Sequence, residues 1–151
     1  DIDHDGDLDF YETRLNANKM FRNNGDGTFT EQASKMGLAG EEGSYSIDAA
    51  FGDFDDDGDI DLFVVNKNAN NILYENQRQG NFEDISEKIG LKGSKNSSAV
   101  AVGDYNNDGF LDLLVTSFNG MDTALYHNLN NGSFKKKDGV NKIFKSLRDI
   151  T

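Results

Sequence analysis

Carboxylates at alternate positions make residues 53–61 the stretch of this sequence best suited to chemistry. Asp stands at positions 1, 3, 5, 7 and 9 of this nine-residue segment, with Gly58 at position 6. Five like charges this close repel one another, so folding such a loop requires a cation at its centre. Glycine allows the sharp bend that brings the two ends together. Hard oxygen ligands in this number favour Ca²⁺ over Zn²⁺ or Mg²⁺, and the segment is predicted to be a calcium loop.

The same layout occurs three times. Loop 1 (residues 1–9) lies 52 residues before loop 2 (residues 53–61), and loop 3 (residues 104–112) lies 51 residues after it. Each copy has Asp at positions 1, 5 and 9, Gly at position 6, and Ile or Leu at position 8, and Asn106 replaces the position-3 Asp in loop 3. An acidic, solvated loop without metal is the alternative, and it is strongest for loop 3, which has the fewest charges.

The composition narrows the classes of function. The 151-residue chain has a formal net charge of −12, and the three loops hold 14 of its 27 acidic residues. This charge argues against nucleic acid and anionic membranes as partners, and three bound Ca²⁺ ions would reduce it to −6. The chain has no Cys, so disulfides and Cys-based zinc sites are excluded. No apolar run approaches the length of a membrane span. Because the first residue already belongs to loop 1, we expect the chain to be part of a longer protein.

An EF-hand or dockerin-like calcium site is a competing interpretation. Glu12 falls where an EF-hand loop places its bidentate Glu, and Leu8 also suits that motif. The equivalents of Glu12 are Val64 and Val115, which cannot bind a metal. Short apolar runs that read as buried strands, and not periodic helices, follow loops 2 and 3.

The segments between the loops also repeat. Residues 46–52 and 98–103 are small or β-branched and predict a strand leading into loops 2 and 3. Later in each repeat an aromatic residue, an Asn, a Gly and a Phe recur at matching offsets, which predicts a hairpin over residues 20–29, 73–82 and 125–134. A period near 52 residues with four short strands is typical of a β-propeller blade.

The ends of the repeats differ. Residues 33–38 and 85–91 predict one helical turn closed by a Gly. The third repeat instead becomes basic over residues 135–148, with apolar residues over 143–150 that could form a short amphipathic helix. We interpret the basic side chains as a solvated face. The predicted repeats are residues 1–45, with a missing start, 46–96, and 97–151, with a divergent end.

Loops 2 and 3, with the Leu that follows each, resemble FG-GAP/VCBS repeats. The hairpin around residues 126–134 is similar to that of the bacterial VCBS subset. The resemblance implies an all-β fold, in which three blades of four short antiparallel strands are a section of a propeller with about seven blades. It implies side-chain ligands at positions 1, 3, 5 and 9 and a backbone carbonyl ligand at position 7. Carried over, the ligands are Asp1, Asp3, Asp5, Asp7 and Asp9; Asp53, Asp55, Asp57, Asp59 and Asp61; and Asp104, Asn106, Asp108, Phe110 and Asp112.

The sequence is compatible with two classes of function. The first is a secreted or cell-surface module, stiffened by about three structural Ca²⁺ ions, that binds an extracellular protein or polysaccharide. The second is a domain of a secreted, polysaccharide-active enzyme. We favour the first, because the sequence shows no nucleophile–base set and His4 and His127 read as ordinary surface residues. The expected further partners are the rest of a longer propeller chain or a second copy of this chain, without nucleic acid and without membrane insertion.

Overall fold

Three antiparallel sheets make up the described part of the protein. The computed structural model describes residues 1–78, 80–91, 95–120, 122–137 and 140. We call the sheets blades 1, 2 and 3. Blade 1 contains β1 (Phe10–Glu12), β2 (Lys19–Asn23) and β3 (Phe29–Glu31); blade 2 contains β4 (Ser46–Gly52), β5 (Asp61–Asn66), β6 (Ile72–Asn76) and β7 (Phe82–Asp84); blade 3 contains β8 (Ser97–Gly103), β9 (Asp112–Ser117), β10 (Ala124–Asn128) and β11 (Phe134–Lys136).

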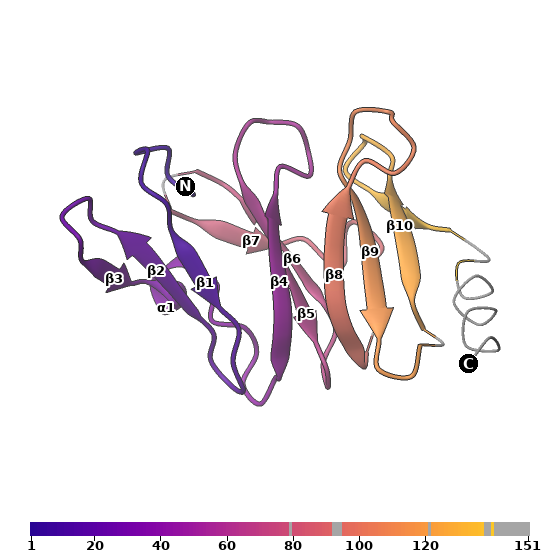
Figure 1. Cartoon of the computed structure of the whole chain (residues 1–151), viewed down its shortest axis with the longest axis horizontal. Coiled ribbons are helices and arrows are strands. Elements are labelled where there is room, and N and C mark those ends of the chain that lie inside the picture. Colours follow the sequence, from indigo (N-terminus) through magenta and orange to yellow (C-terminus); the bar gives the residue numbers. More distant parts are fainter. Residues whose placement is uncertain (79, 92–94, 121, 138–139, 141–151) are drawn as a thin grey trace.

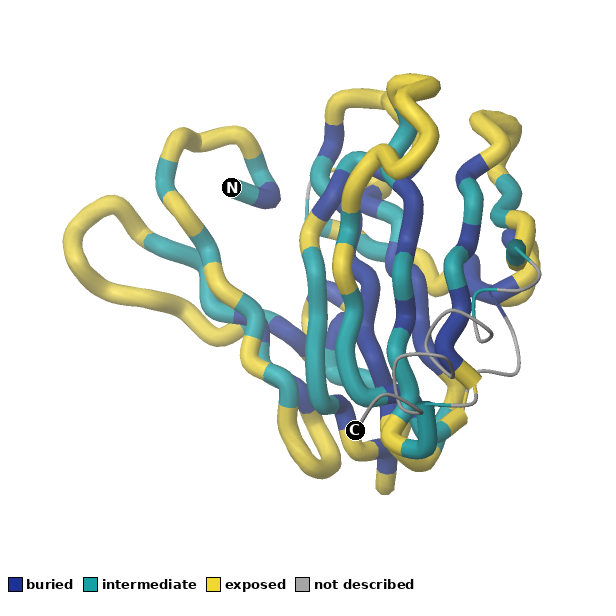
Figure 2. Tube along the Cα trace, turned by 45° about the vertical axis from the view of Figure 1, so that its right-hand side comes forward, coloured by how far each residue is buried: buried dark blue, intermediate teal, exposed yellow. Residues whose placement is uncertain are grey.

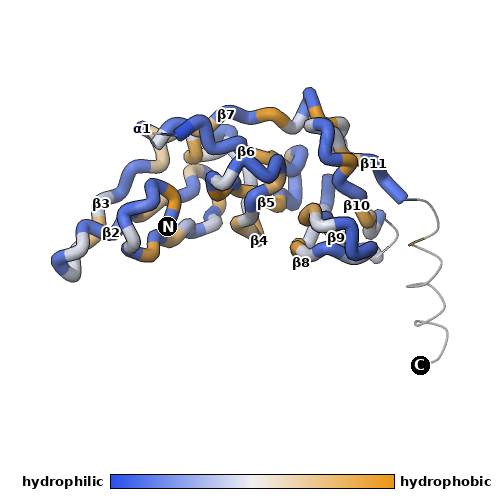
Figure 3. Tube along the Cα trace, turned by 90° about the horizontal axis from the view of Figure 1, so that it is seen from above, coloured by the Kyte–Doolittle hydropathy of each residue, from blue (hydrophilic) through white to orange (hydrophobic). Residues whose placement is uncertain are grey.

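The strands of each blade pair in chain order, which is the meander of a propeller blade. Blades 2 and 3 have the four predicted strands, and blade 1 has three among the described residues, which correspond to the second, third and fourth strands of the other two blades. The blades stand side by side in an open row (Figures 1 and 3). The all-β class with antiparallel sheets is therefore confirmed, and the sheets fit the blades of a propeller, whereas closure into about seven blades stays a prediction. No helix in the described part of the chain is long and apolar enough to cross a membrane.

Loops 2 and 3 connect the first two strands of their blades in the same register. Gly52 pairs with Asp61 at the mouth of loop 2, and Gly103 pairs with Asp112 at the mouth of loop 3. Both strand pairs carry a bulge near their far ends. Repetition of register and bulge places the two loops in equivalent positions on their blades.

The apolar core lies between the blades, and β5 supplies both halves of it. Alternate side chains of a strand point to opposite faces. Leu62 and Val64 therefore join the cluster shared with blade 1, whereas Phe63 and Val65 join the cluster shared with blade 3. Every residue of β5 is buried, in contrast to the exposed loops above the strands (Figure 2).

The predicted helical turns are present after the first two hairpins. The short helix α1 (Ala33–Met36) ends at Gly37, whose φ of 80° places it in the left-handed region that glycine tolerates. Residues 86–90 form a hydrogen-bonded turn that ends at Gly90, also with φ 80°. The amphipathic helix considered for residues 143–150 lies outside the described residues.

Two buried asparagines tie neighbouring blades together. The Asn76 side-chain amide donates to the Ile2 carbonyl in loop 1 at 3.1 Å, and that of Asn128 donates to the Phe54 carbonyl in loop 2 at 2.7 Å. Each amide also reaches the position-8 carbonyl of the loop in its own blade, at 3.2 Å. The Asn of the repeated hairpin pattern thus fixes the distance between consecutive loops.

Replacing one of these asparagines should lower stability measurably. Asn128→Ala leaves the Phe54 carbonyl without its donor, and we expect a loss of about 1–3 kcal/mol in the free energy of unfolding. Asn131→Ala, at an exposed turn, is the control and should change it by less than about 0.5 kcal/mol. Urea denaturation followed by circular dichroism measures both. Equal effects from the two substitutions would contradict the bridging role of Asn128.

Candidate metal centres

All three loops lie at the same end of the blades (the top of Figure 1). Their backbones curl in the same way, because position 4 of each loop has a left-handed conformation and Gly at position 6 follows it. The φ angles are 60° at His4, 62° at Asp56 and 62° at Asn107, and 91°, 90° and 94° at Gly6, Gly58 and Gly109. The bend predicted from the position-6 glycine is therefore present in every loop.

The carboxylate at position 1 holds the curl closed from inside. Asp53 accepts hydrogen bonds from the backbone N–H of Asp57 at 3.2 Å and of Gly58 at 3.0 Å. Asp1 and Asp104 accept the equivalent pairs in loops 1 and 3. Bonds from the backbone amides, first that of Gly109, hold the pKa of Asp104 below its usual range.

The aspartate at position 9 joins the loop to the sheet. One of its oxygens accepts the backbone N–H at position 2 of the loop. The other accepts the backbone N–H of the Asn that ends β2, β6 or β10 in the same blade. In loop 2, Asp61 Oδ2 accepts from Phe54 N at 2.9 Å and Asp61 Oδ1 accepts from Asn76 N at 2.8 Å. Loops 1 and 3 repeat this pair at Asp9 and Asp112.

Positions 1, 3 and 9 bring carboxylates together in two of the loops. In each set one oxygen from every member lies within 4.8 Å of the others; the sets are Asp1, Asp3 and Asp9, and Asp53, Asp55 and Asp61. In loop 3 the position-3 residue is Asn106, whose amide donates to Asp108 at 2.8 Å. Buried Asp3 Oδ1 has no hydrogen-bond partner among the described residues. An oxygen cluster with an unpaired buried acceptor fits a hard cation such as Ca²⁺.

Burial makes two carboxyl groups of loop 2, those of Asp55 and Asp61, weaker acids than usual. Burial, with a smaller contribution from Asp55 and Asp53, raises the pKa of Asp61 to about 7. Burial, followed by the charges of Asp57 and Glu75, raises the pKa of Asp55 to about 6. Without a cation, loop 2 therefore binds protons near neutral pH, whereas a cation would favour the ionised form.

The position-7 side chain of loop 2 is bonded to groups outside the carboxylate cluster formed by positions 1, 3 and 9. Asp59 is buried and accepts hydrogen bonds from Arg78, through its Nε, and from His4 at 2.8 Å. These bonds, that from Arg78 first, hold the pKa of Asp59 below its usual range. With its carboxylate engaged, Asp59 has only its backbone carbonyl to offer a metal. Phe110 at position 7 of loop 3 likewise has only its backbone carbonyl to offer, because its side chain cannot bind a metal.

The expectation that both histidines are ordinary surface residues is wrong for His127, whereas His4 is exposed as expected but contacts a neighbouring loop. His4 belongs to loop 1 but bonds to Asp59 of loop 2, so it links two consecutive loops. The His127 side chain is only 16% exposed, and its Nδ1 lies 3.1 Å from Asp112 Oδ1. Sequence reasoning missed both contacts, although one signal was present for the second: His127 follows the hairpin aromatic at the same offset as Arg22 and Glu75.

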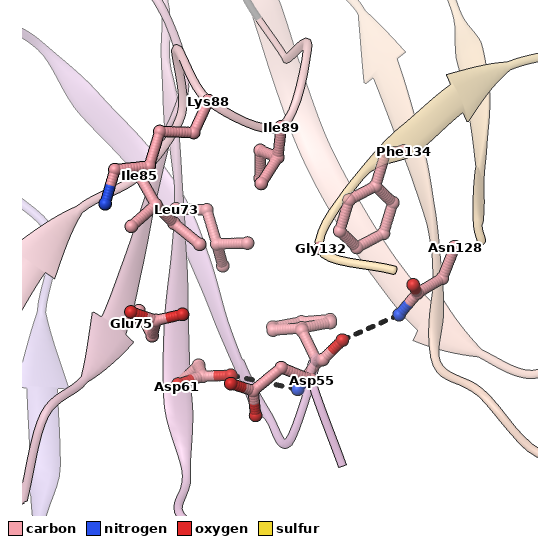
Figure 4. Close-up of a pocket in the computed structure, with 11 residues that line it drawn as sticks. Asp55, Asp61, Leu73, Glu75, Ile85, Lys88, Ile89, Asn128, Gly132 and Phe134 are labelled. Carbon is pink, nitrogen blue, oxygen red and sulfur yellow. Dashed lines mark hydrogen bonds between the residues drawn. The ribbon is translucent and has the colours of Figure 1, made fainter. Parts of the chain in front are cut away.

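A cleft of about 180 Å³ opens beside loop 2, between blades 2 and 3. Figure 4 shows Asp55, Asp61 and Glu75 facing one another at one end of it. The opposite wall is apolar and includes Ile89 and Phe134. Of the two loop 2 carboxylates that line the cleft, that of Asp55 is exposed and that of Asp61 is buried.

Residues 1–64 and 53–115 match the FG-GAP-like repeat family. The chain belongs to this family. FG-GAP-like relatives include cartilage acidic protein 1 of Xenopus tropicalis, which is 29% identical over 107 residues, or 70% of this chain and 16% of that protein. The mouse and human proteins of the same name are 34% and 33% identical over 61 residues, or 40% of this chain and 9% of each protein. The FG-GAP-like chain therefore matches only a small part of these relatives.

The raised pKa values predict an unusual pH dependence for the metal-free protein. A carboxyl group with a higher pKa in the folded state makes folding less favourable as pH rises from its unfolded pKa, near 4, to its folded pKa. For Asp55 and Asp61 this window ends near pH 6 and pH 7. After chelator treatment, the melting temperature should therefore fall between pH 5 and pH 7.5, and Asp61→Asn should flatten this slope. A melting temperature that rises over this interval would contradict the prediction.

Proposed function

We propose that this chain is a calcium-binding β-propeller module that serves extracellular recognition. The observation that carries the proposal is the convergence of the carboxylates at positions 1, 3 and 9 in loops 1 and 2. Such a cluster is costly without a cation, because like charges within a few ångströms repel one another strongly. The ligands are those expected from the sequence, including the position-7 carbonyls, with one Ca²⁺ ion per loop.

The proposed ions have a structural role. Each loop is anchored to its blade through the position-9 aspartate, so an ion bound there would stabilise the connection between strands as well as the loop. The asparagine bridges would extend this effect to the next blade. Carboxylates engaged in this way are unavailable as general acids or bases, and we therefore propose binding and not catalysis as the activity.

The chemistry of the proposed sites supports an extracellular location. Weak oxygen sites fill at the millimolar calcium levels outside cells and stay empty at cytosolic levels. Similarity to proteins named for cartilage supports the same location. The proposed ligand is an extracellular protein or polysaccharide, bound at the loop-bearing ends of the blades.

Calcium removal tests the metal part of the proposal. If each site binds with a Kd of about 10 µM, Ca²⁺ at about 1 mM adds roughly 2.7 kcal/mol per site to the free energy of unfolding. EDTA should therefore lower the melting temperature substantially, and Mg²⁺ should restore it poorly. A melting temperature that EDTA leaves unchanged would overturn calcium binding.

Two adjacent aspartates give a matched control for this test. Asp55 belongs to the carboxylate cluster of loop 2, whereas exposed Asp56 at position 4 does not. Asp55→Asn and Asp56→Asn remove the same charge, but only the first should abolish binding at loop 2 in isothermal titration calorimetry. Equal losses from the two would mean that the loop attracts ions diffusely.

The recognition part requires its own measurement. We expect the calcium-loaded chain to bind components of an array of glycans and matrix proteins, and to lose this binding in EDTA. A hydrolysis assay on the polysaccharides that bind serves as the control for the enzymatic alternative. Turnover of a bound polysaccharide would replace recognition with catalysis as the function.

A further inference from the structure

One strand position faces all three loops and carries a different charge in each repeat. Arg22, Glu75 and His127 each stand just before the Asn whose backbone N–H binds the position-9 aspartate. All three are half-buried. A cation, a carboxylate and an imidazole thus occupy equivalent places beside loops that are otherwise closely similar.

In repeat 1 this position supplies a positive charge to the ligand carboxylates. Arg22 donates through Nε to Asp3, and through Nη2 to Asp5 at 2.8 Å. Positions 3 and 5 are both expected ligands, and Asp3 keeps its other oxygen, Oδ1, unpaired. The guanidinium therefore holds two ligands in place while it repels any ion bound between them.

In repeat 2 the same position supplies an additional carboxylate. Glu75 lines the cleft together with Asp55 and Asp61, and the three face one another in Figure 4. Glu75 also borders a second hollow with Asp55 and Asp57. Its carboxylate therefore lies on the open side of loop 2, where a calcium ion with six to eight ligands has room for another oxygen.

The arginine near loop 2 does not reproduce the effect of Arg22. The main partner of Arg78 is the carboxylate of Asp59, which is not part of the loop 2 carboxylate cluster. Its Nη2 lies 4.0 Å from Asp57 Oδ2, and the side chain is 65% exposed. Solvent screens the charge of such an exposed group. Loop 2 therefore keeps its ligand carboxylates available, whereas two of those in loop 1 are paired.

We propose that this strand position sets the calcium affinity of each loop, so that Glu75 makes loop 2 the tightest site and Arg22 weakens loop 1. The inference rests on the calcium binding put forward above. Loop 3, with three loop carboxylates and His127 at this position, binds more weakly than loop 2. As calcium rises, loop 2 fills before the other two.

The position-6 glycines allow each loop to be followed separately. Their amides donate to the position-1 carboxylates, at 3.0 Å for Gly6, 3.0 Å for Gly58 and 2.8 Å for Gly109. Binding of Ca²⁺ to those carboxylates should shift the amide signals. A Ca²⁺ titration of the ¹⁵N-glycine-labelled chain, read by heteronuclear NMR, gives one midpoint per loop, and that of Gly58 should be the lowest.

Two substitutions then test the inference. Glu75→Gln should raise the Gly58 midpoint by about tenfold, because it removes a unit charge a few ångströms from the ion. Arg22→Gln should lower the Gly6 midpoint by a similar factor. Glu83→Gln and Arg14→Gln remove charges in more exposed contacts outside the loops and should move neither midpoint beyond about twofold.

The outcomes separate this inference from the proposed function. If no glycine signal responds to Ca²⁺ in the unsubstituted chain, calcium binding itself fails. If the signals respond, but Glu75→Gln and Arg22→Gln behave like their controls, calcium binding stands and the graded sites are refuted. A Gly58 midpoint above that of Gly6 in the unsubstituted chain would refute the proposed order directly.

Discussion

The buried aspartate at position 9 is the constraint on which the rest of the structure depends. It connects the curled loop to the strand that ends with the hairpin Asn. Its burial is stable only because both oxygens accept backbone N–H groups, since an unsatisfied buried carboxylate is very costly. Once it is in place, the strand that follows the loop starts in a fixed register, and that register directs alternate side chains into the two neighbouring cores.

Contacts between loops extend this local anchor along the chain. Asn76 and Asn128 connect each loop to the preceding one, and His4 adds a second link from loop 1 to loop 2. Because the loops lie at one end of the blades, these bonds form a polar layer above the apolar core. The core holds the blades together, whereas the polar layer fixes the distance between their loops.

Features that repeat along the sequence predicted the fold. The contacts that were not predicted are made by residues that do not repeat. The spacing of the loops, the position-6 glycines and the hairpin Asn and Gly residues gave the strands, their order and the bends. The contacts of His4, Arg22 and Arg78 could not be predicted, because they depend on where a neighbouring blade or hairpin places a loop in space. Comparison of the repeats shows that Arg22, Glu75 and His127 are equivalent, but not that they face the loops.

The burial of β5 on both faces has a consequence for how this chain unfolds. Leu62 and Val64 pack toward one neighbour and Phe63 and Val65 toward the other, so the described residues of blade 2 form no apolar cluster of their own. In a nearest-neighbour description of repeat proteins, the intrinsic free energy of such a unit is unfavourable and the interface terms supply its stability. Cooperativity in this chain is therefore a property of adjacent pairs of blades: loss of blade 1 or blade 3 exposes one of the two clusters that bury β5, and unfolding propagates from that interface along the row.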